Sequence, residues 1–263
     1  MQLLILLLVI LQITEPGSKP KDPYKLVWSD EFNVDGAPDT TNWVYDIGHG
    51  SNGWGNNEVQ YYTSNADNVL VKDGKLVIQA IKKDGKWTSA RLKSQGKRNW
   101  TYGKIVFSAR LPVGKGTWPA LWMLGENITS LGWPACGEID IMEHVGRNPG
   151  IVQCALHTRA SHGDTENKQS LPVGSFNTEF HTYEANWTEE QIDFLIDGKL
   201  YYTYKPAVRD NDHWPYNTPF FIIMNVAIGG GFGGEVDPAI SEAKMEVDYV
   251  RVYELKKPKK KKA

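Results

Sequence analysis

The sequence predicts an all-β protein, a sandwich of antiparallel sheets of the jelly-roll kind. Three observations lead to this prediction. Short runs of alternating apolar and polar residues recur along the chain, and Asp-Gly pairs typical of tight hairpins separate some of them. Within the interior, no stretch of 12 or more residues has helical spacing without Gly or Pro. At 263 residues, the chain is long enough to fold around one large core.

The two ends of the chain differ in composition from its interior. Residues 1–23 contain an apolar run, 3–13, that at eleven residues is shorter than the ~20 needed to cross a bilayer, and a linker with three Pro follows it. We interpret this segment as a secretory signal and linker and expect a secreted protein without a membrane span. Residues 256–263 carry six Lys and form a polybasic tail. One domain is expected over 24–255.

The strands are expected where apolar and polar residues alternate most regularly. The clearest such segments are 75–81, 103–111, 192–197 and 245–253. Asp-Gly pairs at 73–74 and 197–198 predict hairpin turns next to two of them.

The charge balance excludes some partners. The chain has 29 Lys and Arg against 31 Asp and Glu, a formal net charge of −2. Because the tail contributes six positive charges and residues 1–23 contribute none, the body carries −8. An acidic body is poorly suited to nucleic acid or to sulfated polymers. Ten Trp, twelve Tyr and 25 Gly indicate a turn-rich protein with aromatic side chains that stack on a flat ligand.

The two cysteines, Cys136 and Cys154, are too few for a disulfide scaffold. If their strands pair through a turn near residues 147–150, Cys154 faces Ile141 or Met142. Cys136 is then several residues away, so two free thiols are expected.

The most informative segment is 138–143, which places Glu138, Asp140 and Glu143 within six residues. In a regular strand the first two share a face and the third points the other way. One extra residue in a β-bulge restores the parity. With Ile139, Ile141 and Met142 directed inward, all three acids lie on the outer face.

Paired carboxylates suit cleavage of a glycosidic bond, in which one attacks the anomeric carbon and the other protonates the leaving oxygen. Spacing alone leaves a solvated acidic face or a cation site open. Three tryptophans near the acids, Trp118, Trp122 and Trp133, favour a sugar cleft, because indole faces stack on pyranose rings.

With its preceding residues 132–137 (GWPACG), the hexapeptide 138–143 (EIDIME) resembles the active-site strand of glycoside hydrolase family 16 in its bulged, laminarinase-like form. Further segments resemble that family in the same order. They are 27–33 (VWSDEFN), 53–63 (GWGNNEVQYYT), 89–92 (SARL), 111–124 (LPVGKGTWPALWML), 220–230 (FFIIMNVAIGG) and 247–253 (VDYVRVY). The resemblance covers roughly residues 25–255.

The resemblance implies a lectin-like jelly roll of two curved antiparallel sheets with an open cleft. It implies that Glu138 is the nucleophile, Glu143 the general acid/base and Asp140 their electrostatic partner. We expect a double displacement with net retention. His157, on the strand expected beside the acids, is predicted to donate to Asp140 or Glu143; the alternative is a structural histidine.

The residues predicted to bind the sugar lie on loops and on strands beside the acids. Asn56 and Glu58 belong to a glycine-rich loop that could instead bond only to itself, and Arg91 could simply pair with a carboxylate. The full predicted set is Trp54, Asn56, Glu58, Arg91, Trp118, Trp122, Trp133 and Asn225.

No cofactor is expected for catalysis. The resemblance implies one structural Ca²⁺, bound through Glu31, a carbonyl near Gly74 and Asp248.

The preferred function is endo-hydrolysis of β-1,3-glucan such as laminarin, with mixed β-1,3/1,4-glucan as a further substrate. Agarases and carrageenases of the same branch are the alternative enzymes, although the neutral or acidic motifs of this chain suit sulfated polymers poorly. A non-catalytic β-glucan-recognition protein and a transglycosylase remain open, the first disfavoured because both glutamates are present. We expect a monomer.

Overall fold

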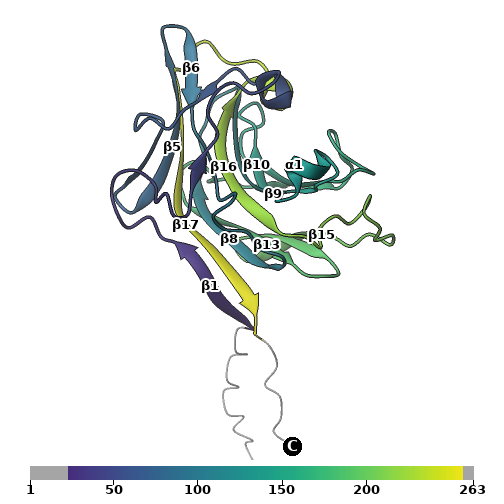
Figure 1. The fold of residues 1–263 in the computed structure, drawn as a ribbon. Helices are drawn as coiled ribbons and strands as arrows, with labels where there is room; N and C mark the ends of the chain where they lie inside the picture. The colour runs from purple at the N-terminus through teal and green to yellow at the C-terminus, as the bar shows by residue number, and fades with distance from the viewer. Residues whose placement is uncertain (1–22, 257–263) are drawn as a thin grey trace, which may run out of the picture.

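The computed structural model describes residues 23–256, which fold into two stacked sheets (Figure 1). Residues 1–22 of the predicted signal and linker, and residues 257–263 of the polybasic tail, lie outside the described residues. Among the described residues, the helices are single short turns and no helix is long and apolar enough to cross a membrane. The predicted all-β sandwich is confirmed.

The larger sheet has ten strands, in the order β15-β14-β13-β8-β17-β5-β6-β3, with β1 paired to β17 and β4 paired to β5. All pairs are antiparallel except β3 with β6. Its strands are β1 (Tyr24–Asp30), β3 (Tyr61–Tyr62), β4 (Val69–Lys72), β5 (Lys75–Lys83), β6 (Lys86–Ser89), β8 (Gly103–Arg110), β13 (His181–Trp187), β14 (Ile192–Ile196), β15 (Lys199–Tyr204) and β17 (Glu242–Leu255).

The smaller sheet has seven strands in the order β12-β11-β10-β9-β16-β7-β2. Its strands are β2 (Val44–Tyr45), β7 (Arg91–Lys93), β9 (Thr117–Gly125), β10 (Glu138–His144), β11 (Ile151–His157), β12 (Lys168–Pro172) and β16 (Phe220–Ile228). Three short helical turns, η1 (Gly53–Asn57), α1 (Ile128–Leu131) and α2 (Gly230–Gly233), lie in its connecting loops.

The four strand segments expected from alternation correspond to β5, β8, β14 and β17. The turn between β4 and β5 has positive φ at Asp73 (52°) and Gly74 (69°), and the turn between β14 and β15 has the same at Asp197 (51°) and Gly198 (71°). Two consecutive positive φ angles define the tight hairpin turn that Asp-Gly favours. The two predicted hairpins are therefore confirmed.

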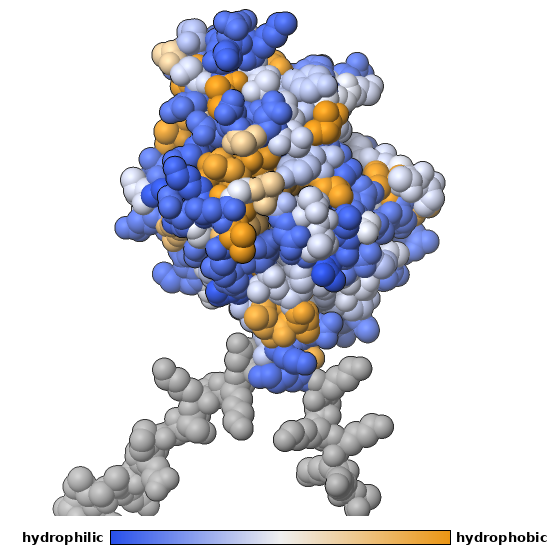
Figure 2. Space-filling view, turned by 60° about the vertical axis from the view of Figure 1, so that its left-hand side comes forward, coloured by the Kyte–Doolittle hydropathy of each residue, from blue (hydrophilic) through white to orange (hydrophobic). Residues whose placement is uncertain are grey.

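The core fills the space between the two sheets. Its largest fully buried side chains include Trp43, Trp187, Tyr183, Phe107 and Phe194. Most of the aromatic excess of the sequence is therefore structural. On the face seen in Figure 2, hydrophilic residues cover most of the surface and hydrophobic residues form several separate groups.

Both cysteines are buried and free. Cys154 lies on β11 opposite the stretch between Asp140 and Glu143, as the sequence predicts. Cys136 packs in a separate small cluster with Leu124 and Phe221.

Candidate active site

A cleft of about 770 Å³ crosses the face of the smaller sheet that points away from the core. Strands β9, β10, β11 and β16 supply its floor, and loops at their ends supply its walls. Every residue predicted from the sequence to act in catalysis or to bind sugar lines this cleft.

Strand β10 contains the predicted bulge. Asp140 pairs with Ala155 and Glu143 with Gln153, so two residues of β10 lie opposite Cys154 alone. Ile139, Ile141 and Met142 are buried in the core. The bulge therefore directs Glu138, Asp140 and Glu143 into the cleft, since the extra residue restores their common face.

Glu138 lies opposite His157 of β11, and its side chain is 17% exposed. The indole Nε1 of Trp133 donates a hydrogen bond to its Oε2 at 2.9 Å. Burial raises the pKa of Glu138 to about 8, and the like charge of Asp140 adds to this. His157 and the Trp133 hydrogen bond act in the opposite direction.

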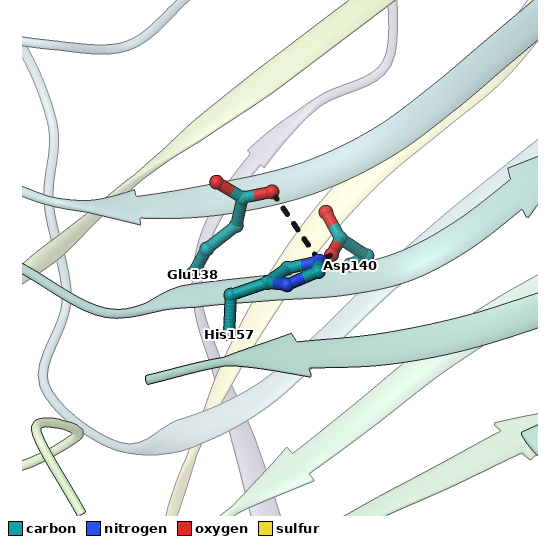
Figure 3. A group of neighbouring side chains, drawn as sticks. All are labelled: Glu138, Asp140 and His157. Carbon is teal, nitrogen blue, oxygen red and sulfur yellow. Dashed lines mark ion pairs between the residues drawn. The ribbon is translucent and has the colours of Figure 1, made fainter. Parts of the chain in front are cut away.

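Asp140 lies between the two glutamates and is 3% exposed. Its Oδ2 is 3.1 Å from Nε2 of His157 (Figure 3). Burial and the charge of Glu143 hold the pKa of Asp140 well above its usual range, although a hydrogen bond from Glu138 lowers it. Burial and like charge therefore disfavour ionisation of both Glu138 and Asp140.

Glu143 accepts two hydrogen bonds at the other end of the bulge. Trp118 Nε1 donates to its Oε1 at 2.9 Å, and Gln153 Nε2 donates to its Oε2 at 3.2 Å. Burial raises the pKa of Glu143, whereas these two donors favour its ionised form. Since the pKa of Glu138 is raised to about 8, the group retains a proton at neutral pH.

A chain of hydrogen bonds forms one wall of the cleft. Trp122 Nε1 donates to Asn225 Oδ1 at 2.8 Å, and Asn225 Nδ2 donates to the Tyr62 hydroxyl at 3.1 Å. The Tyr62 hydroxyl donates to Glu58, which also accepts from Asn56 at 3.1 Å. Asn56 and Glu58 therefore bond to each other, as in the self-bonded alternative, yet both line the cleft.

Arg91 is held from three sides. Its Nε lies 3.1 Å from Asp46 Oδ2, so its charge is paired. Its guanidinium carbon lies 5.0 Å from the ring centre of Trp54 and 4.8 Å from that of Trp122. Arg91 thus joins the two indoles at this wall by cation–π contacts.

The loop of η1 and the loop of α2 meet at the rim of the cleft. A side chain at Gly230 would place its Cβ 2.7 Å from the Asn56 carbonyl oxygen, and the φ of Gly230 is +74°. Only glycine permits this approach.

Three residues that contact the site are absent from the sequence prediction: Gln153, Tyr62 and Tyr216. Strand alternation could have identified Gln153, which is two and four residues from Ala155 and His157 on one face. Tyr62 similarly follows Glu58 and Gln60. The Tyr216 hydroxyl lies 3.2 Å from the carbonyl oxygen of Glu138 and 3.1 Å from that of His157, and no local pattern signals this contact.

The segments predicted to hold calcium meet where β1, β17 and the β4–β5 turn converge. Asp30 pairs with Val250 and Leu76 pairs with Val247. Both carboxylate oxygens of Glu31 are taken by Arg251, at 2.9 and 2.8 Å. The Glu31 side chain therefore does not fit the role of ligand, whereas backbone carbonyls and the Asp248 carboxylate have the oxygen chemistry that Ca²⁺ requires.

Comparisons with known proteins identify the family of this chain. The sequence profile described as "Glycosyl hydrolases family 16" matches residues 56–251. The chain is 46% identical to a "Beta-glucanase" of Rhodothermus marinus, over 94% of this chain and 92% of the relative. It is 38% identical to "Glucan endo-1,3-beta-glucosidase A1" of Niallia circulans, over 89% of this chain but only 39% of the relative.

A solved laminarinase structure from Flavobacterium sp. UMI-01 superposes with a TM-score of 0.85. It shares 48% sequence identity, and the match covers 88% of this chain and all of that one. The chain therefore belongs to glycoside hydrolase family 16. It is a glycoside hydrolase with the jelly-roll fold of that family.

Proposed function

We propose that the protein is a retaining endo-β-1,3-glucanase that acts on laminarin and on mixed β-1,3/1,4-glucan. The observation that carries the proposal is the row of three buried acids, Glu138, Asp140 and Glu143, on one face of the bulged β10 at the floor of the cleft. The names of the relatives support the substrate, and the open, aromatic-walled cleft suits a polymer chain.

In the first step, an oxygen of Glu138 attacks the anomeric carbon and the glycosidic bond breaks. The leaving oxygen takes the proton of Glu143. Trp118 and Gln153 donate to both oxygens of Glu143, so they stabilise the carboxylate that forms.

Glu138 must be ionised to attack, although its pKa is raised to about 8. Asp140, two residues along the same face of β10, offers the proton of Glu138 a second position. When that proton resides on Asp140, the Glu138 oxygen carries the charge. This is the role we propose for Asp140, whose Oδ2 forms an ion pair with His157 at 3.1 Å.

In the second step, water attacks the glycosyl-Glu138 ester. Glu143 takes the water proton, the hydroxyl joins the anomeric carbon, and Glu138 leaves as the carboxylate. The product keeps the β configuration. A sugar acceptor in place of water would give transglycosylation.

Product profiling on laminarin, lichenan, agarose and carrageenan tests the substrate. We expect oligosaccharides from laminarin and lichenan and none from the galactans. Products from agarose or carrageenan alone would overturn the assignment.

Glu138→Gln and the stereochemistry of the product test the mechanism. The variant is expected to lose about 10³-fold or more in kcat on laminarin. Proton NMR of the wild-type reaction should show the β-anomer first. Equal, near-zero rates for wild type and variant would favour a binding protein, and α-anomer as the first product would contradict retention.

We also propose a secreted monomer that binds one structural Ca²⁺. The apolar run 3–13 supports secretion. The separate hydrophobic groups on the face seen in Figure 2 support a monomer. The calcium site that fits uses Asp248 and backbone carbonyls near Glu31 and Gly74.

A further inference from the structure

Two carboxylates and an imidazole converge at one point of the cleft floor. Glu138 and His157 are direct partners in the β10–β11 ladder, and Asp140 is two residues along the same face. One ligand atom from each of the three lies within 4.8 Å of the others. Figure 3 shows both carboxylates beside the same edge of the imidazole ring.

A buried oxygen in this group lacks a hydrogen bond. Asp140 is 3% exposed, and its Oδ2 accepts no hydrogen bond among residues 23–256. Nε2 of His157 is 3.1 Å away, but its N–H is not aligned with that oxygen. A buried carboxylate oxygen without a donor is costly, so this atom favours a cation in the space beside it.

No Lys or Arg side chain in the described part of the chain forms an ion pair with Glu138 or Asp140, whose ion-pair partner is His157. Within the cluster itself, only His157 and bound protons offset the negative charge of Glu138 and Asp140. A divalent cation would replace those protons.

The spacing suits a small tetrahedral ion. In a tetrahedral Zn²⁺ site with bonds of about 2.0–2.1 Å, neighbouring ligand atoms lie about 3.3 Å apart. Nε2 of His157 lies 3.1 Å from Asp140 Oδ2 and 3.8 Å from Glu138 Oε1. These separations lie on either side of the tetrahedral value, so small side-chain shifts would complete the site.

We propose that Glu138, Asp140 and His157 bind one Zn²⁺ and that this ion inhibits the enzyme by excluding the sugar. Three protein ligands leave the fourth position open to water from the cleft. Zn²⁺ accepts imidazole nitrogen and carboxylate oxygen, whereas Mg²⁺ demands an octahedron of oxygens that this group lacks.

The binding of Zn²⁺ and the inhibition of the enzyme rest on different grounds. Zn²⁺ binding follows from the positions of Glu138, Asp140 and His157 alone. The inhibition rests on the proposed function, because the oxygen that ligates the metal belongs to the proposed nucleophile.

Isothermal titration of the full, chelator-stripped chain with ZnCl₂ near neutral pH tests the binding. We expect one Zn²⁺ per chain with proton release, and no heat of binding with MgCl₂. His157→Asn should weaken Zn²⁺ by about tenfold or more, because it removes the nitrogen ligand. Glu179→Gln removes an exposed carboxylate that does not line the cleft, and it should leave the affinity within about threefold.

The visible absorption of Co²⁺ bound to the wild-type protein tests the site without relying on a variant that has to fold. Tetrahedral Co²⁺ on the wild type should show intense visible bands that laminarin oligosaccharides abolish. Zn²⁺ binding that His157→Asn leaves intact, or bands that persist with saturating oligosaccharide, would overturn the proposal. If Zn²⁺ binds as described but laminarin is not hydrolysed, the proposed function fails and the metal site stands.

Discussion

Asp140 controls the protons of the site through its charge. Its carboxylate raises the pKa of Glu138, and the charge of Glu143 in turn raises the pKa of Asp140. Removing the charge of Asp140 lowers the pKa of both glutamates, because ionisation no longer meets a like charge.

We therefore expect Asp140→Asn to move the alkaline limb of the kcat/KM profile on laminarin to lower pH by about one unit. We also expect kcat to fall by about 10²-fold, since an amide cannot take the proton of Glu138. An alkaline limb that stays in place or moves to higher pH would contradict the shared-proton arrangement.

Gln153 lowers the pKa of Glu143, whereas Asp140 raises the pKa of Glu138. Its amide donates to Glu143 at 3.2 Å and favours the ionised form. Gln153→Ala should raise the pKa of Glu143, move the alkaline limb to higher pH and reduce kcat by about tenfold. Gln169→Ala, an exposed amide on the neighbouring β12, is the matched control and should change neither parameter.

At the scale of elements, the pairing of β10 with β11 positions the reacting groups. Glu138 and His157 face each other in this ladder, and the buried Tyr216 hydroxyl contacts the carbonyl oxygens of both. Tyr216 lies in a turn outside the sheet, so this contact holds the backbones of β10 and β11 in position at the site.

Tyr216→Phe should lower the free energy of unfolding by about 1–2 kcal/mol, since it removes a buried hydrogen-bond donor. It should reduce kcat more than it raises KM. Glu138 and His157 would be held less firmly, which lowers kcat, whereas the residues that bind the sugar at the walls of the cleft would be unchanged. Urea denaturation and steady-state kinetics measure the two effects. A loss of stability with unchanged kcat would restrict Tyr216 to a structural role.

The local sequence alone predicts the bulge of β10. Ile139, Ile141 and Met142 can all enter the core only if one extra residue is accommodated, and the core burial of these three residues agrees. By contrast, the contacts of Tyr216 join positions 78 and 59 residues apart, so no local pattern contains them.

At the scale of the whole molecule, buried acids make stability depend on pH. The pKa of Glu138 is raised to about 8 in the folded protein, so the folded state keeps a proton that the unfolded state loses above about pH 4.5. The stabilisation is complete below that pH and is lost as pH rises toward 8.

Glu138→Gln should therefore leave stability nearly unchanged at pH 4.5 and increase it by about 1–3 kcal/mol at pH 8.5. Thermal or urea unfolding at both pH values measures this. The exposed Glu179→Gln is the control and should show no such pH-dependent gain. A variant that gains nothing at pH 8.5 would contradict the raised pKa.

The proposed calcium would join β1, β17 and the β4–β5 turn, which are far apart in sequence. Chelation should lower the melting temperature by about 5–10 °C, the shift expected when a ligand at about 100 times its Kd is removed. Asp248→Asn should abolish the response to chelator. An unchanged melting temperature would count against the ion.

The sequence by itself determined the all-β class, the hairpins at residues 73–74 and 197–198, and the acids of β10, because alternation, turn chemistry and side-chain parity are local properties of a strand. Only the tertiary structure decided the partners of those acids. Trp118 and Gln153 reach Glu143 from β9 and β11, and Arg251 pairs with Glu31, the side chain that the family resemblance assigned to calcium. These contacts depend on sheet order and register, which bring distant segments together and set the charges and protons of the site.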